Sequence, residues 1–239
     1  MITKIFQYEI FNDNMESLLR SIKKFEKVHI VSGNPEVLNN GLQNNILLNN
    51  FTSKNSIIIP DGISTVICSK IVGQPVSGKI AGIELMDSIV KKCESENQGI
   101  YLLGSTKETV DMCNINLRTK YRNLNILGSH DGYFDLDNCE EILEEIEKVS
   151  PKVLFVAMGC PRQELFIAKY MDRLPCNVFM GVGGSFDIIA GNLKRAPKWM
   201  ISIGLEWLYR VAKEPFRIKR LASIPKFIFA VIKDKHKRK

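Results

Sequence analysis

The sequence predicts an α/β protein in which a mainly parallel sheet carries helices on both faces and a helical, basic appendage follows at the C-terminus. Two observations lead to this fold class. Short runs of β-branched and other apolar residues alternate with segments whose apolar residues recur at helical spacing. Positive charge, in contrast, is concentrated at the C-terminal end of the 239 residues.

Six short apolar runs predict the buried strands of the sheet. They are Val28–Val31, Ser56–Ile59, Ile100–Leu103, Leu124–Leu127, Val153–Ala157 and Val178–Val182. An alternating segment before them, Ile5–Ile10, predicts one additional strand. Because helical segments separate the six runs, we expect a Rossmann-like body over residues 1–193.

Apolar residues at helical spacing place helices between these strands. One such set is Ile83, Met86, Ile89 and Val90, and another is Ile142, Leu143, Ile146 and Val149. Two capping-box patterns, Ser105-x-x-Glu108 and Asp137-x-x-Glu140, predict where two of the helices between the strands begin, the second being the one that holds Ile142–Val149.

Residues 194–239 form the predicted appendage. They contain 14 Lys or Arg and three acidic residues, so this segment carries +11 while the 193 residues before it sum to −4. Aromatic and aliphatic residues lie between the cations, a composition that suits an anionic membrane surface, where each cation contributes roughly 1 kcal/mol before screening. We therefore expect the appendage to dock on a membrane. Away from a membrane its apolar residues must be covered, which a homo-oligomer would do.

The remaining composition narrows the class of protein. The start of the chain lacks the charged and apolar regions of a signal peptide, and no run approaches the roughly 20 apolar residues that cross a bilayer. The six cysteines lie 16 to 26 residues apart, which fits neither a zinc site nor a dense disulfide framework. We expect a cytoplasmic protein, peripheral on the inner face of the cell membrane, with reduced thiols and no metal or other cofactor.

Polar and glycine-rich segments follow the predicted strands directly. They are Ser32–Pro35, Pro60–Gly62, Gly104–Thr106, Gly159–Glu164 and Gly181–Ser185. In open α/β sheets the ligand crevice lies outside the carboxyl ends of the strands, where helix N-termini and glycines accommodate phosphate. A nucleotide or another phosphorylated ligand is therefore the expected occupant.

Each candidate residue in these segments has a structural and a functional interpretation. Asp61 is either a helix N-cap or a general base in the crevice. Ser32 and Asn34 either cap the helix that begins at Pro35 or orient a sugar hydroxyl.

Further along the chain, Glu164 in a first helical turn complements the helix dipole, while the amide of Gln163 suits a binding site. The pair Asp135 and Asp137 matches a metal-binding pattern of nucleotide-sugar transferases, but its position favours a turn and a cap.

Three arginines of the appendage, Arg210, Arg217 and Arg220, stand seven and three residues apart, with Pro215 between the first and the second. They form either a solvated basic face or a cluster that folds over the crevice and binds a diphosphate, for which the guanidinium is well suited.

Seven motifs occur in one order along nearly the whole chain. They are Asn34-Pro-Glu36, Pro60-Asp-Gly62, Ala81-Gly-Ile-Glu-Leu85, Gly159-Cys-Pro-Arg-Gln-Glu164, Arg195-Ala-Pro-Lys-Trp199, Gly204-Leu-Glu-Trp-Leu-Tyr-Arg210 and Glu214-Pro-x-Arg217. Together they closely resemble the WecG/TagA/CpsF family of bacterial glycosyltransferases. The resemblance implies inverting, metal-independent transfer of an N-acetylmannosamine-type sugar from UDP to polyprenyl-diphosphate-linked N-acetylglucosamine, as in the linkage unit of wall teichoic acid.

The resemblance also implies roles for individual residues. Asp61 matches the family's proposed base, and Ser32, Asn34 and Gln163 match substrate-binding positions. By the same resemblance, the three appendage arginines complete the site over the diphosphate once the appendage docks on the membrane. Lys79 stands where the family usually has Arg, so a point charge replaces a bidentate fork there.

Three alternatives compete with this function. The first keeps the fold and the lipid-linked acceptor but moves a different sugar, glucose or N-acetylmannosaminuronate, into a capsule or exopolysaccharide. A nicotinamide-dependent dehydrogenase is disfavoured because the chain lacks an early G-x-G-x-x-G. A nucleic-acid-binding protein is disfavoured because the basic segment is rich in aliphatic residues, so nucleic acid is not an expected partner.

Overall fold

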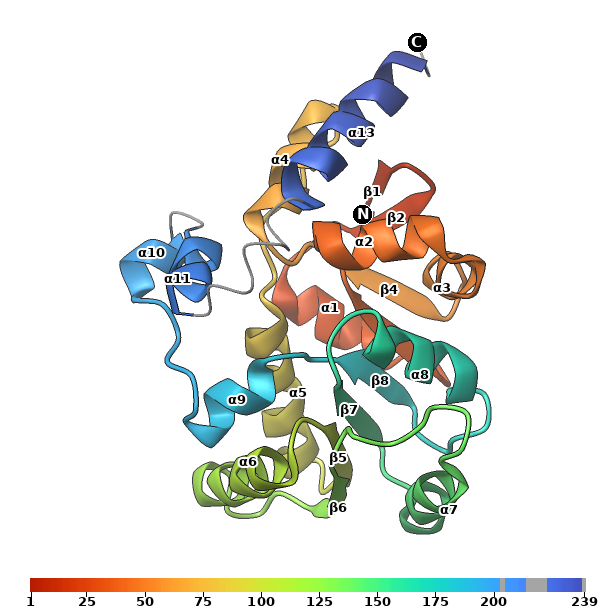
Figure 1. Ribbon diagram of the computed structural model, residues 1–239, viewed down its shortest axis with the longest axis vertical. Coiled ribbons are helices and arrows are strands. Elements are labelled where there is room, and N and C mark those ends of the chain that lie inside the picture. The colour runs from red at the N-terminus through yellow and green to blue at the C-terminus, as the bar shows by residue number, and fades with distance from the viewer. Residues whose placement is uncertain (203–204, 214–222, 238–239) are drawn as a thin grey trace.

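The computed structural model of the protein describes residues 1–202, 205–213 and 223–237, and its centre is an eight-stranded sheet (Figure 1). The strands are β1 (Ile2–Ile5), β2 (Tyr8–Phe11), β3 (Val28–Ser32), β4 (Ser56–Ile59), β5 (Ile100–Gly104), β6 (Ile126–His130), β7 (Val153–Ala157) and β8 (Val178–Gly181). Their order across the sheet is β1-β2-β4-β3-β8-β7-β5-β6, and every neighbouring pair except β1 with β2 is parallel. The predicted mainly parallel α/β architecture is confirmed.

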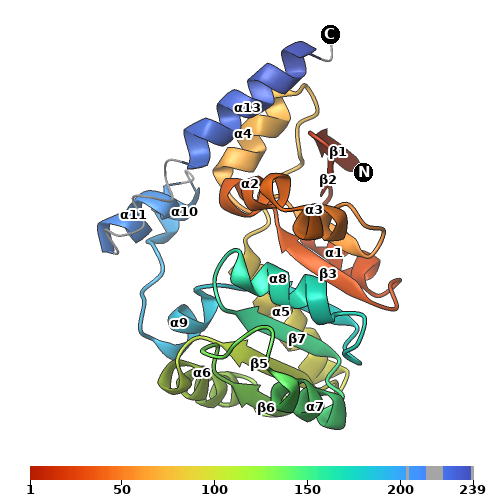
Figure 2. The same cartoon turned by 45° about the vertical axis from the view of Figure 1, so that its right-hand side comes forward.

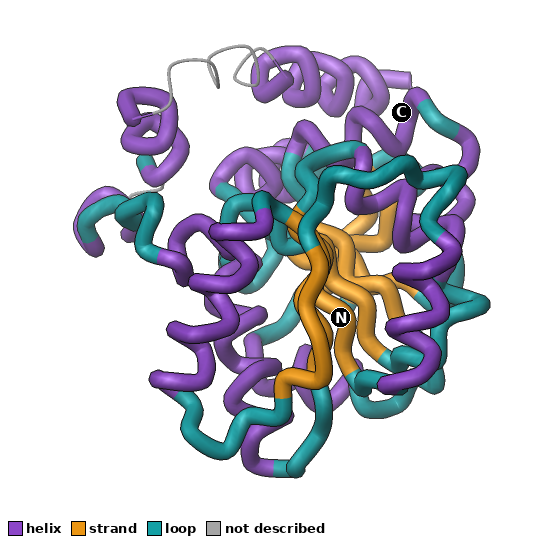
Figure 3. Tube along the Cα trace, turned by 60° about the horizontal axis from the view of Figure 1, so that its bottom comes forward, coloured by secondary structure: helices purple, strands orange, loops and turns teal. Residues whose placement is uncertain are grey.

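Helices cover both faces of the sheet, and the strands lie in the interior between them (Figure 3). The helices of the body are α1 (Met15–Ile22), α2 (Pro35–Gln43), α3 (Asn45–Phe51), α4 (Ile63–Ile71), α5 (Gly82–Ser95), α6 (Lys107–Lys120), α7 (Glu140–Val149), α8 (Arg162–Tyr170) and α9 (Ser185–Ala190). Because successive strand side chains point to opposite faces, Ile30 belongs to the core cluster that includes residues of α1, α5 and α6, whereas Val31 belongs to the cluster that includes residues of α2 and α3. The helices predicted around Ile83–Val90 and Ile142–Val149 are α5 and α7.

Five of the six predicted strands lie where they were expected, but β6 begins two residues later than predicted and ends at His130. Leu124 is buried before the strand begins, so its apolar side chain belongs to the core and not to the strand. As the edge strand, β6 carries the partly exposed Ser129 and His130 and lacks the continuous apolar run of an interior strand.

The N-terminal segment forms a hairpin of two strands, β1 and β2, where one strand over Ile5–Ile10 was predicted. Phe6, in the turn, has a φ of 55°, a left-handed backbone conformation that ends β1 and reverses the chain. The apolar alternation was therefore right in kind, but the reversal within it was missed.

Both predicted capping boxes are wrong. The N-cap of α6 is Thr106, whose side chain accepts the N–H of Thr109, while Ser105 before it has a φ of 61°. Helix α7 begins only at Glu140 and has no side-chain cap. Asp137 instead lies 2.5 Å from Lys169 Nζ.

The C-terminal residues form three described helices, α10 (Lys198–Ser202), α11 (Glu206–Lys213) and α13 (Ser223–Lys237). Helix α13 lies beside α4 and α2 (Figure 2) and buries Phe227 and Val231 in a cluster with the N-terminal hairpin. Lys235 Nζ donates a hydrogen bond of 2.6 Å to the carbonyl of Ile71. The division at 193/194 stays a prediction, and α13 is packed against the body.

Among the residues that the structure describes, no helix combines the length and apolarity needed to cross a bilayer.

Candidate active site

A cleft of about 1090 Å³ opens at the carboxyl ends of the parallel strands. Strands β3 to β8 each contribute to its lining at or just beyond their ends, through Ser32, Asp61, Ser105, Gly132, Gly159 and Gly183 respectively. The C-terminal segment adds Glu206, Val211, Ser223 and Ile224. The crevice predicted from the segments that follow the strands is therefore present, and the appendage forms part of its wall.

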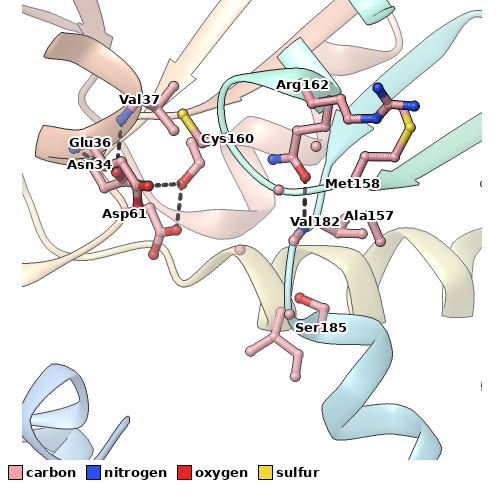
Figure 4. Close-up of a pocket in the computed structure, with 18 of the residues that line it drawn as sticks. Asn34, Glu36, Val37, Asp61, Ala157, Met158, Cys160, Arg162, Val182 and Ser185 are labelled. Atoms are coloured by element: carbon pink, nitrogen blue, oxygen red, sulfur yellow. Dashed lines mark hydrogen bonds between the residues drawn. The ribbon is translucent and has the colours of Figure 1, made fainter. Parts of the chain in front are cut away.

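At one end of the cleft, three polar side chains form a directional hydrogen-bond chain (Figure 4). Asn34 Oδ1 accepts the backbone N–H groups of Glu36 and Val37 at 3.0 and 3.1 Å, which turns its amide nitrogen toward Ser32. Asn34 Nδ2 donates to Ser32 Oγ at 3.0 Å, and Ser32 Oγ donates to Asp61 Oδ2 at 2.6 Å. Each hydrogen bond therefore fixes the direction of the next one, and the series ends at the Asp61 carboxylate.

This arrangement tests the capping interpretation of all three residues. Asn34 is the N-cap of α2, as the structural interpretation predicted, and it also orients Ser32, which is not the cap. Asp61 is not a cap, since α4 is preceded by Gly62 and has no side-chain cap. Its assignment as a general base stays a prediction, which its place in the cleft supports.

On the opposite side of the cleft, Gln163 and Glu164 lie in the first turn of α8 and are 4% and 2% exposed. Gln163 Oε1 accepts the N–H of Gly183 at 3.1 Å, and its Nε2 donates to Glu164 Oε1 at 2.7 Å. Burial raises the pKa of the Glu164 carboxyl to about 7. Gln163 thus reaches the cleft, as predicted, but it also ties α8 to the glycine-rich loop after β8.

Lys79 lines the cleft but is engaged by the C-terminal segment. Its Nζ donates to Glu206 Oε2 at 3.1 Å, and Glu206 Oε1 lies 3.7 Å from Arg195 Nε. Arg195 also pairs with Glu84 at 2.6 Å. Two cations therefore meet one carboxylate at the rim of the cleft, between the body and α11.

The three appendage arginines are not placed by these observations. Arg210 belongs to α11, but its side chain lies outside what the structure describes, and Arg217 and Arg220 lie outside the described residues altogether. Their proximity to a bound diphosphate stays a prediction.

The pair Asp135 and Asp137 forms a turn. Asp135 Oδ1 accepts the N–H of Asp137, and the Asp137 side chain reaches Lys169. The turn predicted for these residues is confirmed, whereas Asp137 does not cap α7. Within the described part of the chain no group of three or more metal-binding side chains occurs.

The model of the glycosyl transferase WecG/TagA/CpsF family matches residues 3–239, almost the whole chain. The chain belongs to this family. Three similar proteins bear one name, N-acetylglucosaminyldiphosphoundecaprenol N-acetyl-beta-D-mannosaminyltransferase. One from Bacillus spizizenii is 37% identical over 85% of this chain and 78% of its own length. One from Bacillus subtilis is 33% identical, over 95% and 90%, and one from Staphylococcus aureus is 36% identical, over 95% and 91%.

As a member of the WecG/TagA/CpsF family, the protein is a glycosyltransferase and not the dehydrogenase that was weighed as an alternative. The glycine-rich segment after β8 therefore belongs to a glycosyltransferase cleft.

Two residues of this glycosyltransferase were not foreseen in the roles they have. Glu164 was interpreted as a partner of the helix dipole but is buried against Gln163. No role was predicted for Glu206, one of the three acidic residues in the basic segment, yet it contacts both Lys79 and Arg195. The signal for Glu206 was its rarity in that segment, whereas nothing in the sequence signalled the burial of Glu164.

Proposed function

We propose that this glycosyltransferase moves N-acetylmannosamine, with inversion at the anomeric carbon, from UDP to N-acetylglucosamine linked through a diphosphate to a polyprenol. The observation that carries the proposal is 33–37% identity, over at least 78% of their length, to three proteins named for this sugar and this acceptor. The product would enter wall teichoic acid or another surface polymer. A cleft of about 1090 Å³ is at the upper end of small-molecule sites, which suits two substrates together.

Asp61 is the proposed general base. An inverting transfer needs one group to take the proton of the acceptor hydroxyl while the UDP leaves from the opposite side of the sugar. Ser32 holds Asp61 Oδ2, and within the described residues Oδ1 has no hydrogen-bond partner, which leaves it for the acceptor. The Asn34–Ser32 chain would keep the carboxylate from rotating, so Ser32 and Asn34 act on the acceptor through Asp61.

The leaving diphosphate needs positive charge close to it. Lys79 lines the cleft beside the C-terminal segment, and Arg210, Arg217 and Arg220 are its proposed partners from the appendage. The second N–H of the Gln163 amide, and N–H groups of the glycine-rich loop other than that of Gly183, would contribute neutral hydrogen bonds from the other wall.

The lipid-linked acceptor makes the membrane surface a proposed partner, with the enzyme peripheral on the inner leaflet. Exposed apolar side chains of the C-terminal helices support this: Trp199 is 63% exposed, Leu208 44% and Phe229 72%, in the segment that carries +11. Such residues enter the headgroup region while cations meet the lipid phosphates. A homo-oligomer that covers them away from the membrane stays a prediction.

The test supplies a short-chain polyprenyl-diphosphate N-acetylglucosamine and a panel of UDP-sugars, and product formation is followed by mass spectrometry. Wild type should use UDP-N-acetylmannosamine in preference to the glucose and mannosaminuronate donors. Asp61→Asn should lower kcat by roughly 10²–10⁴-fold and leave UDP affinity within threefold. Asp87→Asn is the matched control, because its carboxylate pairs with Lys120 and Tyr121 outside the cleft.

Two results would contradict the proposal. If the enzyme transferred another sugar from UDP at a higher rate, the proposed donor, UDP-N-acetylmannosamine, would be wrong. An Asp61→Asn enzyme as fast as Asp87→Asn would remove Asp61 from the chemistry.

A further inference from the structure

Gln163 and Glu164 form a buried amide–carboxyl pair at the base of the glycine-rich loop. The Glu164 carboxyl accepts through Oε1 from Gln163 Nε2, while Glu164 Oε2 has no hydrogen-bond partner among the described residues. Glu164 is 2% exposed, and burying a carboxyl oxygen that has no hydrogen-bond partner costs free energy of folding. A role at the start of a helix does not by itself explain this cost.

Strand β8 fits closely over this pair. A Cβ atom on Gly181 would lie 2.6 Å from Gln163 Nε2 and 3.2 Å from Glu164 Oε1, so that only glycine leaves room for the amide and the carboxyl. Two residues later the N–H of Gly183, whose φ is 46°, donates to Gln163 Oε1. Both ends of the Gln163 amide are therefore used, one by Glu164 and one by the loop.

The orientation of the amide depends on Glu164. An amide can rotate by half a turn and exchange its oxygen for its nitrogen, and the rotated form would point two N–H donors at the N–H of Gly183. The acceptor at Glu164 Oε1 disfavours that rotation because it requires a donor opposite it. Without the carboxyl, nothing else among the described contacts of Nε2 keeps Gln163 Oε1 directed at Gly183.

The protonation state of Glu164 follows from its surroundings. Burial raises its pKa, the hydrogen bond from Gln163 lowers it, and the carboxylate of Glu36 on α2 also raises it. Helix α3, which also packs on α8, contains no charged residue. The neutral acid keeps a carbonyl oxygen for Gln163 and avoids an unpaired buried charge.

We propose that Glu164 is a positioning residue whose acceptor oxygen fixes the Gln163 amide and through it the shape of the Gly181–Gly184 loop on which the UDP moiety of the donor binds. The inference rests on the proposed function for the identity of the ligand. The placement of the loop by Glu164 is a property of the free enzyme.

The experiment compares Glu164→Ala and Glu164→Gln with wild type. Gln keeps the acceptor and is neutral at every pH, whereas Ala removes the acceptor. Glu164→Ala should weaken UDP binding, measured by calorimetry, about tenfold and raise the donor KM more than it lowers kcat. Glu164→Gln should stay within threefold of wild type at pH 6.

Glu108→Gln is the matched control, because Glu108 also lies in a first helical turn but is exposed. Gly181→Ala tests the same pair from the strand side and should also lower UDP affinity, with Glu164 intact. If Glu164→Ala does not fold, the UDP affinity of Gly181→Ala tests the proposal in its place. Hydrogen exchange of the 181–184 amides in the free enzyme should be faster in Glu164→Ala and in Gly181→Ala than in wild type.

The outcomes separate the two proposals. If wild type binds no UDP, the proposed function fails, and hydrogen exchange alone still tests the placement of the loop. If wild type binds UDP and both Glu164→Ala and Gly181→Ala bind it equally well with unchanged exchange, the inference is overturned while the proposed function stands. Equal loss in Glu164→Ala and Glu164→Gln would also overturn it, because an acceptor at this position would then not be enough to place the loop.

Discussion

Replacing Phe227 with alanine tests whether helix α13 is part of the folded body. Phe227 has no exposed surface, and its ring packs edge-on against Phe6, with 5.6 Å between ring centroids. Truncation of a buried phenylalanine costs about 3–5 kcal/mol, since the transfer free energy is lost and a cavity remains. At about 2–4 °C per kcal/mol for a chain of this size, Tm should fall by about 6–20 °C.

The matched control is Phe229→Ala in the same helix, because that ring is 72% exposed and its removal should change stability by less than about 0.5 kcal/mol. Urea unfolding followed by circular dichroism gives both free energies. Hydrogen exchange over residues 223–237 reports whether α13 detaches first, in which case the loss is limited to the free energy with which α13 docks. If the two variants unfold together and exchange equally, α13 is not packed as described.

Three further predictions follow from charged groups. Glu164 has a pKa of about 7 in the fold against 4.5 as its ordinary value, so the fold holds a proton that the unfolded chain releases between these values. Wild type should therefore lose about 3 kcal/mol of stability relative to Glu164→Gln as pH rises from 4.5 to 7, and little more above it, as urea unfolding at pH 5 and pH 8 would reveal; parallel curves would refute this. Glu206→Gln should free Lys79 and tighten UDP binding several-fold in calorimetry, and a second change, Lys79→Met, should cancel the gain; an unchanged affinity would mean that Lys79 does not meet the diphosphate. The double variant Asp135→Asn/Asp137→Asn should keep transfer within threefold of wild type with and without EDTA, because these residues form a turn and an exposed ion pair; loss of activity on chelation, restored by manganese, would assign them to a metal.

The parts of the fold that the sequence predicted well are those governed by local apolar pattern. Strands β4 and β7 have the predicted bounds because interior parallel strands are apolar on both faces. The bounds of the edge strand β6 and the hairpin turn at Phe6 were not predicted correctly. An edge strand tolerates polar residues, and a phenylalanine in the left-handed conformation has no sequence signal.

The sequence predicted which residues line the candidate site but not which of them contact one another. Position after a strand brought Asp61 to the cleft. Its hydrogen bond to Ser32, however, joins the end of β3 to the segment after β4, and these two strands are neighbours only in the folded sheet. Lys79 was expected to meet substrate, and its contact with Glu206 connects residues 127 positions apart. Such pairings depend on packing over long sequence distances, which a pattern in one segment does not contain.

The contact between Phe6 and Phe227 affects when the protein can finish folding. The two rings belong to opposite ends of the chain, so the cluster that holds Ile5, Tyr8 and Val231 has very high contact order. At roughly 5–20 residues per second, synthesis of the intervening chain takes roughly 10–40 s, during which the N-terminal hairpin has no α13 to cover it. The hairpin face is therefore exposed for that time. Docking of α13 onto the hairpin therefore comes late in synthesis, and the helix takes its place against the body only then.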